Sequence, residues 1–249
     1  MPICAQSQGL AHFYREIGTG EPLTGENLVE FRLLYSGELH AASGNTRVAE
    51  KHAIRQELHP QLKRLLATNR GLMEFAAHHS GAPGYSLPTT PEEMELARQP
   101  INSFGATEWH REAGLRYFAK KWERFGCGFI PLVTESVVVR CAIDILFLRP
   151  EEPGRILTSG DLDNRIKTLF DALRLPSNLD ECGGVAPSGD YDPMYCLLED
   201  DQLISEVRVL TDKLLVLPKT QVVSKHDVFL VMHVKLEPQS GSEWEHIYR

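Results

Sequence analysis

The stretch Val137–Leu148 is the feature that most constrains the fold. Apolar residues occupy both of its alternating faces, with only Arg140 and Asp144 interrupting them. A strand that is apolar on both faces belongs near the centre of a sheet, because a solvent-facing strand keeps one polar face. The sequence therefore predicts a sheet built around this strand.

Four other stretches have the composition or alternation of strands. Residues 30–35 read as a short strand in which Phe31, Leu33 and Tyr35 share one side. Residues 227–237 read as a strand with Val228, Leu230, Met232, Val234 and Leu236 on one side and Phe229, Val231, His233 and Lys235 on the other. Residues 206–217 indicate a strand or a hairpin, and 129–133 a strand or an extended segment that leads into residues 137–148. These stretches supply candidate neighbours for the central strand.

Helical periodicity separates these strands. Residues 46–68 follow a helical pattern that Pro60 should end or kink, and 107–125 form a clearer helix with an apolar stripe. Residues 161–173 place Leu162, Ile166, Leu169, Phe170 and Leu173 on one face. The intervening 70–106 are expected to be loop, apart from a short helix at 92–98. We expect an α+β fold in which a mixed β-sheet packs with helices.

The composition indicates one globular domain. The chain has 249 residues, and we assign 1–29 to a lead-in, 30–237 to the domain and 238–249 to a polar tail. No apolar run is long enough to span a membrane, and the N-terminus does not resemble a secretion signal. The five cysteines contain no C-x-x-C pair, which favours free thiols over disulfides or zinc; a zinc site using Cys182 and Cys196 is the less favoured alternative.

Two acidic pairs stand out against this background. Asp161 and Asp163 begin the helix at 161–173, and Asp200-Asp201 precede a later strand. Carboxylates from separate elements can converge on Mg²⁺, which prefers hard oxygen ligands. Crowded acids raise one another's pKa unless a cation offsets them. We therefore predict that the two pairs build one divalent metal site.

Each of these residues also has a purely structural interpretation. Asp163 can cap the helix N-terminus, although a cap accounts for neither Asp161 nor the second pair. Lys167 lies one turn after Asp163, where it can stabilise charge on a phosphate or form an ordinary i, i+4 ion pair with Asp163 or Asp171.

The residue order in both acidic blocks resembles the RusA-type Holliday junction resolvases. The first block is Gly160-Asp161-Leu162-Asp163-Asn164-Arg165-Ile166-Lys167-Thr168-Leu169-Phe170-Asp171-Ala172-Leu173, and the second is Leu198-Glu199-Asp200-Asp201-Gln202-Leu203-Ile204. The family pattern is D-L-D-N-x-x-K-x-x-x-D-A-L, followed after a gap by an acidic pair. By this resemblance the catalytic acids are Asp161, Asp163 and Asp201, and the catalytic lysine is Lys167.

The resemblance implies an enzyme rather than a passive binding domain. It implies a cytoplasmic, homodimeric nuclease of bacterial or phage origin that uses Mg²⁺, or Mn²⁺, to cut branched DNA. Residues 70–128 and 175–197 have no counterpart in compact family members and would be two large insertions. The P-P-S-x-N segment of the family is replaced here by Tyr35-Ser36-Gly37-Glu38.

The charge distribution limits how such a protein can bind DNA. The net charge of −8 argues against a diffuse nucleic-acid binder, so any contact must be focused. Candidate contacts are Arg165 and Lys167 beside the acids, and Arg116, Lys120 and Arg124 on the helix at 107–125. The ordinary interpretation of the last three is a solvated face that forms ion pairs with Glu112 and Glu123.

Two further features bear on function. The segment 175–199 is acidic and has no Lys or Arg, so we expect it to project away from DNA, to gate the site or to order on a protein partner. His52 and His59 are expected to be solvated or to cap a helix.

The alternatives to a nuclease are a binding or assembly module that has little or no activity, in phage defence or a mobile element, and a phosphohydrolase acting on nucleotides.

Overall fold

The computed structural model describes residues 29–41, 47–79, 87–103, 105–150, 161–215, 224 and 226–238. The predicted polar tail beyond residue 238 and all but the last residue of the predicted lead-in lie outside these ranges. Within them, no helix is long and apolar enough to cross a membrane.

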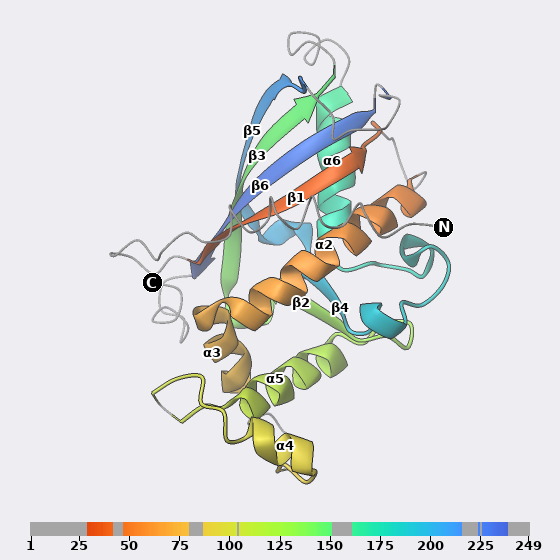
Figure 1. The fold of residues 1–249 in the computed structure, drawn as a ribbon. Helices are drawn as coiled ribbons and strands as arrows, with labels where there is room; N and C mark the ends of the chain where they lie inside the picture. The colour runs from red at the N-terminus through yellow and green to blue at the C-terminus, as the bar shows by residue number, and fades with distance from the viewer. Residues whose placement is uncertain are drawn as a thin grey trace, which may run out of the picture.

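The largest element is a four-stranded sheet in the order β1-β6-β3-β5 (Figure 1). Its strands are β1 (Glu30–Glu38), β6 (Asp227–Pro238), β3 (Val139–Arg149) and β5 (Ile204–Lys213). β1 and β3 pair antiparallel with β6, while β3 and β5 run parallel. The sheet is therefore mixed, and the prediction that the 137–148 strand is an interior strand is confirmed.

One face of this sheet forms much of the core. Cys141, Ile143, Ile145 and Phe147 of β3 are buried beside alternate residues of β6. The other face is less covered than the sequence suggested, because Asp144, Leu146 and Leu148 are only half-buried. β3 is thus apolar on both sides in sequence but fully buried on one.

Two helices lie against the sheet. α6 (Asp161–Leu173) runs behind it in the view of Figure 1 and buries Leu169, Ala172 and Leu173. α2 (Val48–Thr68) contacts both β1 and α6. It continues through Pro60, which is exposed, so an end of the helix at Pro60 is wrong, while the alternative of a kink there stays a prediction.

A second, smaller sheet pairs β2 (Phe129–Val133) with β4 (Met194–Leu198) in parallel. Every residue of both strands is buried. β4 lies at the end of the segment expected to be an insertion at 175–197, so this part of that segment belongs to the core. Its sequence, Met-Tyr-Cys-Leu-Leu, is a short apolar run without alternation, which by itself does not distinguish a strand from a helix.

Two helices lie in the region 70–106 that we expected to be mostly loop, and a third follows it where a helix was predicted. α3 (Arg70–His78) was missed by the sequence prediction, whereas α4 (Pro91–Leu96) and α5 (Glu108–Lys121) were expected. α4 begins with a capping box in which the Thr90 hydroxyl accepts from the Glu93 backbone. α3 packs on α5 so closely that an added Cβ at Gly114 would lie 1.7 Å from the carbonyl oxygen of Ala76.

Four short 3₁₀ helices complete the described structure: η2 (Glu135–Val137), η4 (Asp180–Cys182), η5 (Gly189–Tyr191) and η6 (Asp201–Leu203). The last of them, η6, begins with Asp201 and leads directly into β5. The position of η6 relative to α6 therefore decides where the second acidic pair lies.

Candidate functional site

The first turn of α6 carries the first acidic pair. Asp161 begins the helix, and the side chain of Asp163 is exposed to solvent. Lys167, one turn later, is also exposed. The apolar stripe explains this orientation: Leu169 and Leu173 point into the core and leave Asp163 and Lys167 on the open edge. The structure therefore keeps the predicted acid and amine available to a ligand.

The last turn of α6 belongs to a network of ion pairs. The Lys51 Nζ of α2 lies 2.6 Å from Oδ2 of Asp171, and the Lys51 side chain is only 4% exposed. Arg174 lies 3.5 Å from Asp171 and 3.2 Å from the buried carboxylate of Glu181. Arg55, also buried, donates to the backbone carbonyls of Asp171 and Glu181. These contacts join α6 to α2 and to η4.

The sequence pattern alone anticipated only part of this network. Asp171 and Arg174 flank the apolar stripe of α6, where a polar role is expected. Lys51, the partner of Asp171, lies 120 residues away from it in the chain, and no local spacing signals that contact. The same applies to Arg55, since a buried arginine inside a helix that also carries apolar residues has no distinctive sequence signal.

Asp200 and Asp201 lie beside the ion-pair network at the last turn of α6. The pKa of Asp201 is raised by its partial burial, then by its hydrogen bond and charge repulsion with Asp200; Asp171 raises it further, while Arg174 opposes the shift. The Asp200 side chain also accepts from the Gln202 backbone and caps η6. Asp201 is thus electrostatically coupled to the last turn of α6.

The two predicted acidic pairs consequently lie at different ends of α6. β5 begins with Ile204 opposite Cys141 near the start of β3, whereas α6 follows the end of β3 (Figure 1). A helix between two parallel strands returns the chain to the opposite end of the sheet. Asp163 and Asp171 are two turns apart, about 12 Å along the helix axis.

This separation does not fit one Mg²⁺ ion shared by both pairs. The metal–oxygen bonds of Mg²⁺ are about 2 Å long, and even the two ions of a dinuclear site lie only about 4 Å apart. Among the side chains that the structure describes, no three His, Cys, Asp or Glu residues form a group that could hold a metal. The side chain of Asp161 lies outside that description.

The predicted DNA contacts are also dispersed. Arg165 is buried at 3% exposure, so it is not part of the surface beside Lys167. Arg116 is exposed but pairs with Glu93 of α4 at 3.2 Å, rather than with Glu112, which pairs with Arg111. Lys120 is exposed.

The last predicted contact, Arg124, lies outside the helix. Because α5 ends at Lys121, Arg124 falls in the following turn, where it donates to the carbonyl of Pro176 at 2.7 Å. Arg116 and Lys120 are exposed residues of α5, and in the view of Figure 1 this helix lies on the opposite side of α2 from α6.

The acidic segment 175–199 packs against the domain instead of projecting from it. Glu181 and Cys182 are buried, and Asp192 accepts from the Gly128 backbone. His59 of α2 is buried, contrary to the solvated role we expected; its Nδ1 accepts from the Tyr195 backbone at 3.0 Å, and burial lowers its pKa.

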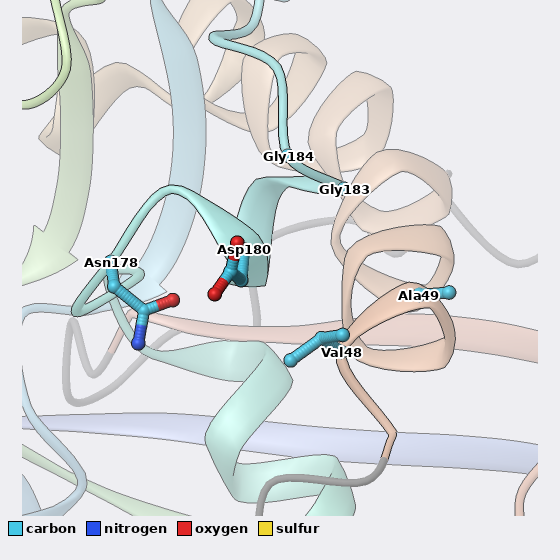
Figure 2. Close-up of a pocket in the computed structure, with 6 residues that line it drawn as sticks. All are labelled: Val48, Ala49, Asn178, Asp180, Gly183 and Gly184. Carbon is cyan, nitrogen blue, oxygen red and sulfur yellow. The ribbon is translucent and has the colours of Figure 1, made fainter.

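An open hollow of about 390 Å³ lies where this segment meets the first turn of α2 (Figure 2). It is lined by Val48 and Ala49 from α2 and by Asn178, Asp180, Gly183 and Gly184 from the η4 region. None of the predicted catalytic residues lines it.

The four described cysteines, Cys127, Cys141, Cys182 and Cys196, are free and buried, and burial raises the pKa of each thiol.

No protein-family model, no curated protein and no solved structure matches the chain.

Proposed function

We propose that the protein is a structure-selective DNA endonuclease that requires Mg²⁺ or Mn²⁺ and acts on branched DNA such as a four-way junction, fork or flap. The observation that carries this proposal is the residue order of the two acidic blocks. It is supported by the exposure of Asp163 and Lys167 one turn apart on α6. Asp200 and Asp201 are exposed as well, so these two acids and Asp163 are accessible to solvent ions.

In this proposal Asp161, Asp163 and Asp201 are the catalytic acids, with Asp200 as a further metal ligand and Lys167 as the catalytic amine. The acids as placed do not fit one ion, so a site shared by all of them would require the chain around Asp161 or around Asp201 to rearrange when DNA and metal bind. A bound cation would offset the repulsion between Asp200 and Asp201 and lower the pKa of the latter.

The test is a cleavage panel of four-way junction, fork, flap and linear duplex, with and without Mg²⁺. We expect cleavage of at least one branched substrate in Mg²⁺, none in chelator, and a loss of about 10²-fold or more in Asp163→Asn. Asp180→Asn is the matched control, since it removes an exposed carboxylate on η4. If no branched substrate is cut with either metal, the proposal is wrong.

A second candidate function is a binding module without cleavage. The observation that favours it is the engagement of Asp171 by Lys51 and Arg174, together with the distance between the two acidic pairs. It predicts that the protein binds branched DNA without cutting it, or that it binds a protein partner through 175–199. A mobility shift that persists in Asp163→Asn, with no product in any lane, would establish it over the nuclease.

A further inference from the structure

One face of the four-stranded sheet is apolar but does not join the core. On the core face of β3, Ile143, Ile145 and Phe147 are buried. Leu146 and Leu148 alternate with them, so they lie on the outer face; both are half-buried, and the hydrophobic core of the described residues includes neither. A strand that is apolar on both sides belongs in a sheet that is covered on both sides. The described residues therefore leave the outer face of the sheet in need of a cover.

The strand register gathers the apolar side chains of this outer face at one end of the sheet. Six of them form two adjacent rows across the strands, which we call the outer patch: Leu34, Val231, Leu146 and Leu210 in one row, and Phe229 and Leu148 in the next. Exposure increases along the first row, from 5% at Leu34 to 65% at Leu210. A contiguous apolar patch of this kind is suited to burial against another apolar surface.

The other end of the outer face is charged, and its charges pair with one another. Asp144 lies 3.7 Å from both Arg208 and Lys235, and His233 lies 2.9 Å from Glu30. These contacts join all four strands. The outer face as a whole therefore favours an apolar partner over a charged one such as DNA.

We propose that the N-terminal segment of the same chain covers the outer patch. Residues 1–28 precede the described structure, and four apolar residues among them recur at i, i+3, i+4 and i+7: Leu10, Phe13, Tyr14 and Ile17. This spacing places the four side chains on one face of a helix. A helix over residues 10–17 would be about 12 Å long, which is similar to the roughly 14 Å spanned by four neighbouring strands.

The connection to β1 lets this segment reach the patch. β1 begins at Glu30, so the segment must extend about 14 Å along the sheet to arrive at Leu34. Residues 18–29 can span up to about 40 Å, which is more than enough.

The C-terminal tail is less well placed to cover the patch. It leaves β6 at Pro238, which lies about 24 Å along the strand from Val231. The first large apolar residue of the tail, Trp244, can extend at most about 21 Å from Pro238. Of the two terminal segments, the N-terminal one therefore fits the outer patch better.

This docking goes beyond the proposed cleavage reaction and does not rest on it. α6, which carries Asp163 and Lys167, packs against the hydrophobic core through Leu169 and Leu173. The docked segment would lie on the opposite face of the sheet and add a third layer to the domain.

Disulfide trapping in the full chain tests the docking. In a Cys4→Ser background, Phe13→Cys combined with Leu146→Cys should form an intramolecular disulfide on mild oxidation, seen as a monomer that has lost two free thiols. His12→Cys combined with Leu146→Cys is the matched control. His12 lies on the opposite side of the proposed helix, so we expect its disulfide to form about tenfold more slowly or less.

Thiol labelling of Leu146→Cys provides the second measurement. Phe13→Asp should raise the rate of reaction with a maleimide about tenfold or more, because a charge within the apolar stripe releases the segment, whereas His12→Asp should leave the rate unchanged. Circular dichroism verifies that each variant is folded, and Val231→Cys replaces Leu146→Cys if the latter is not.

Three results would overturn the proposed docking. The first is equal disulfide formation by the Phe13→Cys and His12→Cys pairs, or none by either. The second is a disulfide that joins two chains instead of one, which would assign the outer patch to a second copy. The third is a labelling rate that Phe13→Asp does not change.

Discussion

Replacing Lys51 by methionine tests the network that anchors α6. The Lys51 ammonium lies 2.6 Å from Asp171 and is nearly excluded from solvent. Removing one member of a buried ion pair costs about 3–5 kcal/mol, because the remaining charge stays buried. Asp171 keeps 16% exposure and a second partner, Arg174. We therefore expect Lys51→Met to lower the free energy of unfolding by about 2–3 kcal/mol, a decrease in Tm of about 4–12 °C.

Urea unfolding followed by tryptophan fluorescence measures this change. The control is Arg70→Met, which removes a surface i, i+4 pair with Glu74 and should cost less than about 0.5 kcal/mol. Lys51→Met/Asp171→Leu removes both charges and should recover about half or more of the loss. If Lys51→Met is as stable as Arg70→Met, Lys51 and Asp171 do not form a buried pair in solution.

Three further predictions concern packing and pH. Gly114→Ala should lower Tm by several degrees in a thermal melt, because its Cβ would overlap the Ala76 carbonyl and force α3 away from α5; an unchanged Tm would show that the helices are not so close. Burial lowers the pKa of His79 to about 4, so its neutral imidazole contributes stability that is complete above pH 6.5 and is lost as pH falls toward 4; the pH profile of stability of His79→Phe should be flatter in that window. The pKa of Asp201 is raised, so the cost of its ionisation to folding is absent below its ordinary pKa, grows as pH rises toward the raised pKa and is complete above it; Asp201→Asn should raise Tm slightly at pH 7 and not at pH 3, and equal shifts at both would contradict the coupling to Asp200 and Asp171.

The sequence predicted those elements whose apolar pattern is long and regular. β3, β6 and α6 are specified by their own periodicity, and their existence and type were predicted correctly. α3 was missed because it is short and follows Asn69, in a stretch that Gly71 and the later Gly81 and Pro83 make resemble a loop. Its stability comes from packing against α5, which no local pattern reveals.

In the candidate site, too, local spacing predicted the features within one helix but not the contacts between distant elements. Local spacing correctly placed Asp163 and Lys167 on the exposed edge of a helix. It could not show which end of that helix Asp201 approaches, since this depends on β5 running parallel to β3. The burial of Arg165 and His59 is likewise a tertiary property, set by the elements that cover them.

Calorimetric titration of Mn²⁺ into the protein in the presence of a branched DNA tests the central claim most directly. If the two acidic pairs share one ion, Asp163→Asn and Asp201→Asn should each weaken the same binding event by about tenfold or more, and the double variant should be little worse than either. Asp180→Asn should bind as the wild type does. Loss of binding in only one of the two variants, or additive losses in the double variant, would contradict a shared site.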